Sequence, residues 1–525
     1  MPQYGSILGA NASMNVPSDI GWALATGAAA RFQSDALIRY CGSTRCSDQT
    51  EPDVSASVIA PPSPAVSQPR SAALGVPVPI GEVYAIAQEY IDASRLDAAE
   101  RMLSHILGPR PNHPDSLHAK GLIAYRRGRL DQAVTLMERG IAAGGTRPVH
   151  WRNISEAYRL VGRLDDALAA ARRAVTLDPA DPLGPFNLAM VLYDRLELPA
   201  CVAAARHCLD LRPDLPQGHM KMAQALLLTG ELGAGWEHYE RRYQIPGAAP
   251  LMPPTDRTQW DGRPLRGERL LLIGDQGYGD VLMFARYVPW ACNRADTVVM
   301  ACSREMERTI RRMFPGVEIY TQWDLIPPYA FFCPLSGLPR LHGTTLENIP
   351  PVRPPYQADP VQAAQWKARL DRDIPPGMRR VGIAWAGRPT HNNDHNRSLG
   401  LAAFAPIGAV EGIALVSLQK DPPAAQAKAW EGSAKLLDLD AEIGGFEDTA
   451  AIIDGLDLVV CVDTAVGHLA GVMGKPAWII LPYAPDWRWL TGRSDTPWYP
   501  TLRLFRAPAP KRLDAAVAAV AAAIA

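Results

Sequence analysis

The feature that most constrains the fold is an internal repeat of 34 residues that begins near residue 80. A period of this length is typical of stacked helix pairs, in which each unit buries its apolar face against the next unit. Small residues recur where the helices must approach closely. In the first helix of each unit they are Ala87, Gly121, Ser155, Ala189 and Ala223, and in the second helix Ala99, Ala133, Ala167, Cys201 and Gly235. The sequence therefore predicts an α-helical solenoid over residues 79–249.

Three of the five units also close on a proline, at Pro111, Pro179 and Pro213. Small residues at the helix crossings and a closing proline at this period resemble the tetratricopeptide repeat. The resemblance implies an array whose concave face binds a peptide or a protein. A plain spacer is the alternative that these residues leave open.

The second half of the chain has a different pattern. After a proline-rich linker at 250–266, short apolar runs alternate with helix-like segments, first within 267–365 and again within 376–525. Such alternation is typical of parallel sheets covered by helices, so we expect two α/β domains behind the solenoid. Residues 1–78 are rich in Ser, Ala, Pro and Gly. We expect this segment to form a flexible leader.

The first candidate ligand loop is GDQGYGD, residues 274–280, between an apolar run and helix-like sequence. It meets neither the dinucleotide pattern GxGxxG nor the P-loop pattern. A turn at Gly277 and Gly279 would let a ligand approach the backbone, and Gln276 could hydrogen-bond an acceptor or a sugar. Asp280 stands at the helix start. A carboxylate there is also explained by the free N–H groups of the first turn, with no role in chemistry.

The second candidate is VVCVDTAVGHLAGVMGKPAWIILPY, residues 459–483, which predicts strand, loop, helix and strand. Asp463 and Thr464 stand at the carboxyl end of the first strand. Ligands of open α/β sheets bind at that edge, and the following helix offers free N–H groups to an anion. Thr464 is also a good N-cap residue, so a plain helix start is the alternative.

The third candidate is the polar loop at 388–398, which follows the strand-like run RVGIAWAG. It contains Arg388, Arg397 and Ser398 and lies at the carboxyl end of a predicted strand. Such loops often carry ligand contacts, although a solvated surface turn would have the same composition.

The loop-rich stretch 485–500 carries three aromatic residues, Trp487, Trp489 and Trp498. Their rings could stack on a base or a sugar, or they could wedge two domains together.

Segments 270–287, 380–400 and 456–500 together resemble the family 9 glycosyltransferases, the heptosyltransferase-like group. The family pattern Asp-Thr-Gly-x-Ser-His is matched from Asp463 to His468. Ala465 replaces the usual glycine and Gly467 replaces the common serine. Both positions remain small, so close approach of a ligand to the backbone survives, but a serine hydroxyl is lost.

This resemblance, with the array, covers residues 80–525 and implies a helical solenoid followed by two Rossmann-like domains of the GT-B architecture. It implies that Asp280 is the general base, with Arg397, or Arg388 in reserve, and His468 beside the donor diphosphate. It also implies inverting, metal-independent transfer from a nucleotide-sugar, which is a co-substrate, with no further cofactor. The layout is similar to that of bacterial flagellin glycosyltransferases, so we expect a protein acceptor on the concave face of the repeats.

The rival hypothesis is a scaffold whose transferase fold no longer turns over, and the changes at Ala465 and Gly467 favour it. A net charge of -1 argues against nucleic acid as the main partner. Two Asp-x-Asp strings, at 371–373 and 438–440, are triplets common by chance, and we predict no metal site. The absence of a long apolar run or a basic leader segment predicts a cytoplasmic protein without a membrane span.

Overall fold

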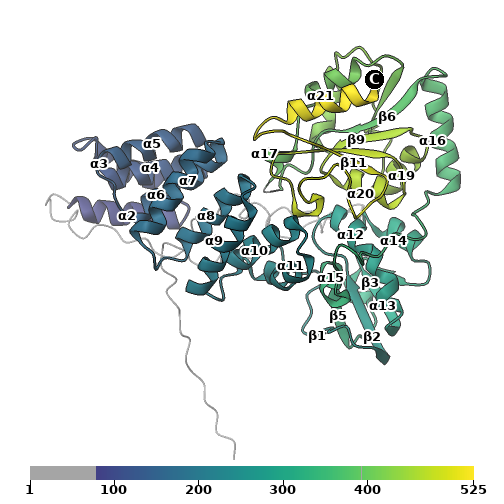
Figure 1. The fold of residues 1–525 in the computed structure, drawn as a ribbon, viewed down its shortest axis with the longest axis horizontal. Coiled ribbons are helices and arrows are strands. Elements are labelled where there is room, and N and C mark those ends of the chain that lie inside the picture. The colour runs from purple at the N-terminus through teal and green to yellow at the C-terminus, as the bar shows by residue number, and fades with distance from the viewer. Residues whose placement is uncertain (1–78, 392) are drawn as a thin grey trace, which may run out of the picture. The chain divides into compact units, whose positions relative to one another are not determined.

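The computed structural model describes residues 79–391 and 393–525, so the predicted leader at 1–78 lies outside the described residues. The chain forms two compact units. The first ends at Val161, and the second is Gly162–Ala525. The boundary falls inside the helical array, so the first unit contains α2–α6 and the second contains the remaining helices and both sheets (Figure 1).

The helical solenoid is present as predicted. In the first unit α2 packs on α3 and α4 on α5, and in the second α8 packs on α9 and α10 on α11. The helices are α2 (Ile80–Asp92), α3 (Leu96–Leu107), α4 (Pro114–Arg126), α5 (Leu130–Ala142), α6 (Pro148–Val161), α7 (Leu164–Leu177), α8 (Leu183–Asp194), α9 (Leu198–Leu211), α10 (Pro216–Thr229) and α11 (Leu232–Tyr239), followed by the 3-10 turn η2 (Glu240–Gln244).

The small residues of the repeat lie where helices of one pair touch. A Cβ added at Gly121 would come within 2.7 Å of Met137 Cγ, and one at Gly235 within 2.6 Å of Leu227 Cδ2. Larger side chains at these positions would push the paired helices apart. Close helix packing therefore explains the small size that these positions share along the repeat.

The turns inside the repeats follow the same period. Positive φ angles recur at Ser94 (55°), Gly128 (73°), Gly162 (85°), Leu196 (57°) and Gly230 (91°). These residues are 34 positions apart, and each follows the first helix of its pair. A left-handed residue ends a helix readily when it is glycine, because glycine has no Cβ to clash.

We expect Ser94→Gly to stabilise the first unit. A left-handed non-glycine residue costs about 1–2 kcal/mol, and the greater freedom of unfolded glycine cancels about 0.5–1 kcal/mol of the gain. Because Ser94 is exposed, no packing is lost. The net gain should be about 0.5–1 kcal/mol in urea unfolding, and the reciprocal variant Gly128→Ser should lose a similar amount. A lower stability of Ser94→Gly would contradict this account of the turn.

The first sheet is all parallel, with the order β1-β5-β2-β3-β4. Leu271, Ile273, Val299 and Ala301 form its buried core on one face. Its elements are β1 (Thr258–Gln259), β2 (Leu265–Ile273), β3 (Ala295–Ala301), β4 (Glu318–Tyr320), β5 (Phe331–Pro334), α12 (Tyr278–Phe284), α13 (Val288–Cys292), α14 (Glu307–Met313) and α15 (Leu338–His342).

The second sheet is also all parallel, with the order β11-β10-β9-β6-β7-β8. The C-terminal helix packs on β10 and β11, where it buries Val517 and Val520. The elements are β6 (Arg379–Ala384), β7 (Ile413–Ser417), β8 (Leu436–Leu437), β9 (Leu458–Val462), β10 (Ala477–Leu481), β11 (Leu502–Arg506), α16 (Pro360–Asp373), α17 (Asp394–Arg397), α18 (Ala405–Gly408), α19 (Phe446–Asp454), α20 (Ala465–Val472) and α21 (Leu513–Ile524). The predicted α/β region with two parallel sheets is thus confirmed.

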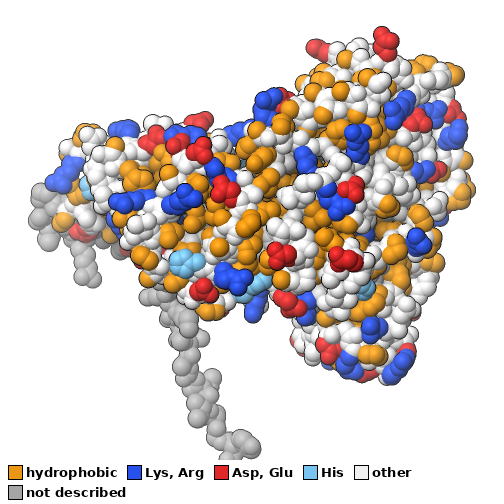
Figure 2. All heavy atoms as spheres, in the orientation of Figure 1, with side chains coloured by type: hydrophobic (Ala, Val, Ile, Leu, Met, Phe, Trp, Pro, Cys, Tyr) orange, Lys and Arg blue, Asp and Glu red, His pale blue; other side chains and the backbone are white. Residues whose placement is uncertain are grey.

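The surface is mixed in charge. Lysine and arginine side chains are interspersed with aspartate and glutamate over the face drawn in Figure 2, and the formal net charge of the sequence is -1. Within the described ranges, no helix combines the length and the apolar character needed to cross a bilayer.

Candidate functional site

Two loops, one from each sheet, meet because the helices that follow them pack together. Strand β2 leads into α12, β9 leads into α20, and α12 contacts α20 (Figure 1). Gly279 on α12 lies so close to His468 on α20 that an added Cβ would come within 2.8 Å of His468 Cδ2. The glycine loop at 274–280 and the Asp463–His468 motif are therefore neighbours in space.

Asp280 is the third residue of α12, and both of its carboxylate oxygens have partners. Oδ2 accepts the Gly277 N–H at 2.9 Å, and Oδ1 forms an ion pair with Arg488. The side chain is 18% exposed. Burial raises the pKa of Asp280 above its ordinary value, although the Arg488 guanidinium and the Gly277 N–H oppose this rise. A carboxylate with a raised pKa is a stronger base than an ordinary aspartate.

Arg488, which the sequence did not indicate, is the cation that pairs with Asp280. It lies on the 3-10 turn η8 (Trp487–Trp489), and its Nη1 donates to Asp486 Oδ1 at 2.6 Å. Its side chain is 12% exposed. Burial lowers the pKa of Arg488, but Asp280 and Asp486 outweigh burial and hold it well above the ordinary value.

The motif at the end of β9 is buried. Asp463 is 7% exposed, and burial, reinforced by Asp486 and opposed by Arg397, raises its pKa to about 6. Thr464 occupies the N-cap position of α20 without a capping hydrogen bond from its side chain, and its Oγ1 is buried without a hydrogen-bond partner among the described residues. Ala465 begins α20. The motif therefore presents backbone and a carboxylate at the carboxyl edge of the sheet.

Packing explains the glycine at position 467, where the family pattern has serine. A Cβ at Gly467 would come within 2.7 Å of Ile479 Cδ1 and 3.1 Å of Cys461 Sγ. Strands β9 and β10 thus leave no room for a side chain on this side of α20. The departure from the pattern follows from the core of this sheet.

His468 is buried among aromatic rings and is 4% exposed. Its Nδ1 and the Tyr499 hydroxyl share a hydrogen bond of 2.9 Å, and its ring centroid lies 5.3 Å from that of Trp489. Burial, with a smaller contribution from Arg488, lowers the pKa of His468 to about 3. The imidazole is therefore neutral at physiological pH and contributes no positive charge.

The polar loop at 388–398 is closed by internal hydrogen bonds. The Gly387 N–H donates to Ser398 Oγ at 2.8 Å, and Ser398 Oγ donates to Asp394 Oδ1 at 2.7 Å. Arg397 lies across Gly387, where an added Cβ would come within 2.7 Å of its Nη2. Its Nε is buried without a hydrogen-bond partner in the described structure. Ser398 thus shapes the loop, and Arg397 Nε lies 3.5 Å from Asp394 Oδ1 in an ion pair. The Arg397 guanidinium also lowers the pKa of Asp463.

Arg388 extends from this loop to the first sheet's domain. It is exposed, its Nη2 lies 3.5 Å from the Tyr278 hydroxyl, and its guanidinium lies 5.4 Å from the centre of the Tyr278 ring. Because Tyr278 begins α12, this contact places a second guanidinium beside the glycine loop.

The glycine loop itself is anchored by a carboxylate that the sequence did not single out. Asp275 accepts the Ser336 N–H at 3.0 Å and the hydroxyls of Ser336 and Tyr243, and Arg242 Nε lies 3.9 Å from it. The next residue, Gln276, is exposed and has a φ of 65°, a conformation that a non-glycine residue rarely adopts. Residues of η2, beyond the last helix of the array, therefore hold the loop that carries Asp280.

The tryptophans of 485–500 are buried and join the array to the sheets. Trp487 meets Trp236 of α11 edge to face, with ring centroids 5.2 Å apart, and Tyr239 with centroids 5.8 Å apart. Trp487 therefore packs against the last helix of the array.

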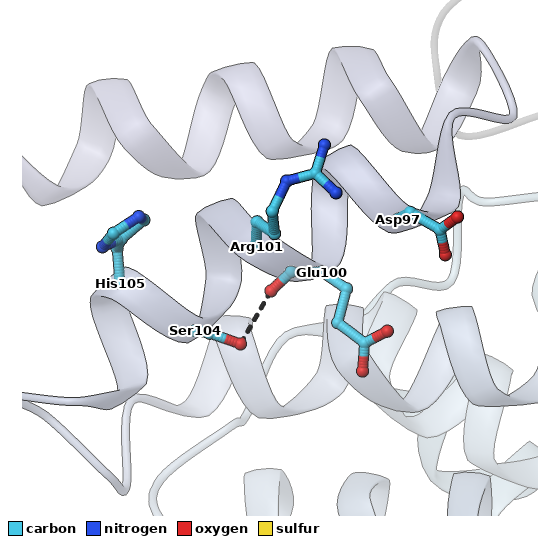
Figure 3. Close-up of a pocket in the computed structure, with 5 residues that line it drawn as sticks. All are labelled: Asp97, Glu100, Arg101, Ser104 and His105. Atoms are coloured by element: carbon cyan, nitrogen blue, oxygen red, sulfur yellow. Dashed lines mark hydrogen bonds between the residues drawn. The ribbon is translucent and has the colours of Figure 1, made fainter.

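A surface hollow in the first unit lacks the converging charged groups of the site described above. It lies in the first unit beside α3, and the described residues that line it, shown in Figure 3, are Asp97, Glu100, Arg101, Ser104 and His105. All five lie on one helix. Asp97 and Glu100 already pair with Arg127. The hollow therefore brings no converging set of groups together.

The Asp-x-Asp strings are engaged in ion pairs. Asp371 pairs with Lys367 at 2.7 Å, and Asp440 pairs with Lys420 at 2.9 Å. Within residues 79–391 and 393–525, no group of three or more His, Cys, Asp or Glu side chains is arranged to hold a metal ion.

Comparison with known proteins identifies the repeats. The tetratricopeptide repeat model matches residues 84–148 and 118–182. Protein FlbA of Caulobacter vibrioides (strain ATCC 19089 / CIP 103742 / CB 15) is 30% identical over 315 residues, which are 53% of this chain and 50% of FlbA. The chain thus spans about half the length of that curated relative.

Two solved structures that align with the chain each cover less than a third of it. A MamA structure from Desulfovibrio magneticus RS-1 is 17% identical, with a TM-score of 0.29, over 31% of this chain and 92% of that chain. A thermophilic TPR protein of Thermus thermophilus, TTC0263, is 19% identical, with a TM-score of 0.29, over 32% of this chain and 92% of that chain. From the family match, the chain contains tetratricopeptide repeats, a class of array suited to binding protein partners.

Proposed function

We propose that the chain is a GT-B glycosyltransferase that moves a sugar from a nucleotide-sugar to a protein acceptor with inversion. One observation carries the proposal. The packing of α12 on α20 brings Gly279, the residue before Asp280, against His468 of the Asp463–His468 motif. These are the groups that the resemblance to family 9 assigns to the base and to the donor site.

In the proposed reaction the acceptor oxygen attacks the anomeric carbon as the bond from that carbon to the diphosphate oxygen breaks. Asp280 takes the acceptor proton, and the nucleoside diphosphate leaves with its negative charge. Arg397 and Arg388 would neutralise that charge, and the N-terminal N–H groups of α20 would face it. His468 would supply a neutral hydrogen bond, since its pKa is lowered to about 3.

The repeats are proposed to bind the acceptor. Tetratricopeptide arrays bind proteins, and in this chain the array is joined to the site: the Tyr193 hydroxyl of α8 donates to Pro485 O at 3.1 Å, and Trp236 of α11 packs on Trp487. An acceptor held by the last repeats would thus lie close to the loop that carries Arg488. A bacterial surface protein such as flagellin is the acceptor class to test first, in the cytoplasm.

The donor site can be tested without an acceptor. A thermal-shift screen against UDP-, GDP-, ADP- and CMP-sugars should identify the nucleotide. Arg397→Ala should then weaken binding of that nucleotide-sugar by about 1–3 kcal/mol in calorimetry, because it removes a charge-assisted hydrogen bond. The exposed Arg372→Ala is the matched control and should bind normally. Equal affinity of wild type and Arg397→Ala would place the diphosphate elsewhere.

A scaffold without turnover is the second candidate. The observation in its favour is that both oxygens of Asp280 are already engaged, by Gly277 and Arg488. Hydrolysis or transfer of any nucleotide-sugar by the full chain, abolished by Asp280→Asn, would reject the scaffold. Binding of a protein partner with no turnover of any donor would favour it.

A further inference from the structure

The resemblance leaves Arg488 without a role, although it is the largely buried cation that pairs with Asp280. The two residues are 208 positions apart in sequence, and their ion pair joins α12 of the first sheet's domain to the 485–490 loop of the second. The same guanidinium bonds Asp486 and lies 4.2 Å from the centre of the Trp487 ring. Its three neighbours therefore fix it in position.

The array contributes to that position. Trp487, on which Arg488 rests, meets Trp236 and Tyr239 of α11, and its ring centroid lies 6.3 Å from that of Trp498. Helix α10 also contacts η8. The loop that presents Arg488 to Asp280 is thus packed between the last repeat and the second sheet's domain.

We infer that Arg488 is the positioning residue of Asp280: it holds the carboxylate ionised and oriented at the junction of α12 and α20. The inference rests on the proposed function and deepens it, because it explains how a partly buried carboxylate remains ionised and available as a base. The geometry is specific. Oδ2 is held by the helix N-terminus through Gly277 while Oδ1 is held by Arg488, so the plane of the carboxylate is defined by both contacts.

The charged groups around Asp280 show why Arg488 determines the protonation state of this carboxylate. The carboxylates of Asp486 and Asp275 raise the pKa of Asp280, after burial itself, whereas Arg488 and the Gly277 N–H lower it. The phenols of Tyr239 and Tyr499 also face this group, with raised pKa values of about 12 that keep them neutral. His468 on α20 is neutral as well. Without Arg488, the carboxylate would keep burial and two like charges, and a proton would bind to it at higher pH.

The test is a titration of Asp280 by carbon-13 NMR in the full chain labelled at aspartate carboxyl groups, with Asp280→Asn used to assign the signal. In Arg488→Gln the Asp280 midpoint should rise by about 1–3 pH units, the effect of an opposite charge at close range. Arg488→Lys keeps the charge but loses the fork that reaches both carboxylates, so a smaller rise is expected. Arg493→Gln removes an arginine from the same stretch, where it pairs with exposed Asp495, and should leave the midpoint unchanged.

An unchanged Asp280 midpoint in Arg488→Gln overturns the inference. If that variant does not fold, Arg488→Lys is titrated instead. An Asp280 midpoint that does not rise in Arg488→Lys then overturns the inference. Where transfer is measurable, the acid limb of the kcat/KM profile should move upward with the NMR midpoint, which a purely structural arginine would not cause. A wild-type chain that transfers no sugar from any donor would contradict the proposed function, while the titration would still decide the role of Arg488.

Discussion

Replacing Asp280 by asparagine is expected to slow sugar transfer by about 10²–10⁴-fold, because the acceptor proton would have no general base. Asparagine can still accept the Gly277 N–H, so the start of α12 is kept. Donor affinity should change little, since the nucleotide would lie on the second sheet's domain. In the wild type, the raised pKa of Asp280 means that activity should be lost as pH falls through a value above that of an ordinary aspartate, about 3.9.

Asp359→Asn is the matched control for this experiment. Asp359 also sits at a helix start, where it accepts the N–H groups of Val361 and Gln362 at 3.0 and 3.1 Å, and it also pairs with an arginine, Arg312. Single-turnover rates and melting temperatures of both variants should be compared. If Asp280 were only a helix-start carboxylate, the two variants would behave alike, with lowered melting temperatures and near-normal rates.

Trp236→Ala is expected to destabilise the Gly162–Ala525 unit by about 3–5 kcal/mol, the usual cost of deleting a buried tryptophan. Trp236 is 1% exposed. Its ring meets Tyr239, Phe284 and Trp487 within 6.3 Å between centroids. Deleting it leaves a cavity between the last repeat, α12 and η8.

A chain beginning near residue 250 would lack Trp236 entirely, along with Tyr243 and Arg242 around Asp275, and should fail to fold stably.

Urea unfolding followed by fluorescence and circular dichroism measures the effect. Leu211→Ala is the control, because Leu211 lies in α9 of the same array but is 38% exposed. It should cost much less than Trp236→Ala. A stable, nucleotide-binding chain that starts at residue 250 would show that the sheets fold without the array and would refute this prediction.

The helical array and the two-sheet architecture could be predicted because each depends on a local pattern. Small residues recur every 34 positions where helices cross, so the packing of paired helices could be predicted from Ala87 to Gly235. Apolar runs that alternate with helix-like segments likewise indicate parallel sheets, since strand and helix have different periodicities. The Asp463 motif and the 274–280 loop each directly follow an apolar run in the sequence. Their positions at the ends of strands could therefore also be predicted.

The candidate site could be predicted only in part, because its charges depend on contacts between distant segments. Nothing local links Arg488 to Asp280 across 208 positions, or Tyr243 to Asp275. Local sequence also cannot show that His468 is neutral, since burial among Trp489 and Tyr499 sets its pKa. The sequence by itself determined which elements form and which polar residues end the strands. Only the tertiary structure decided which charges are paired, because pairing and desolvation exist only once the last repeats and both sheets are packed together within Gly162–Ala525.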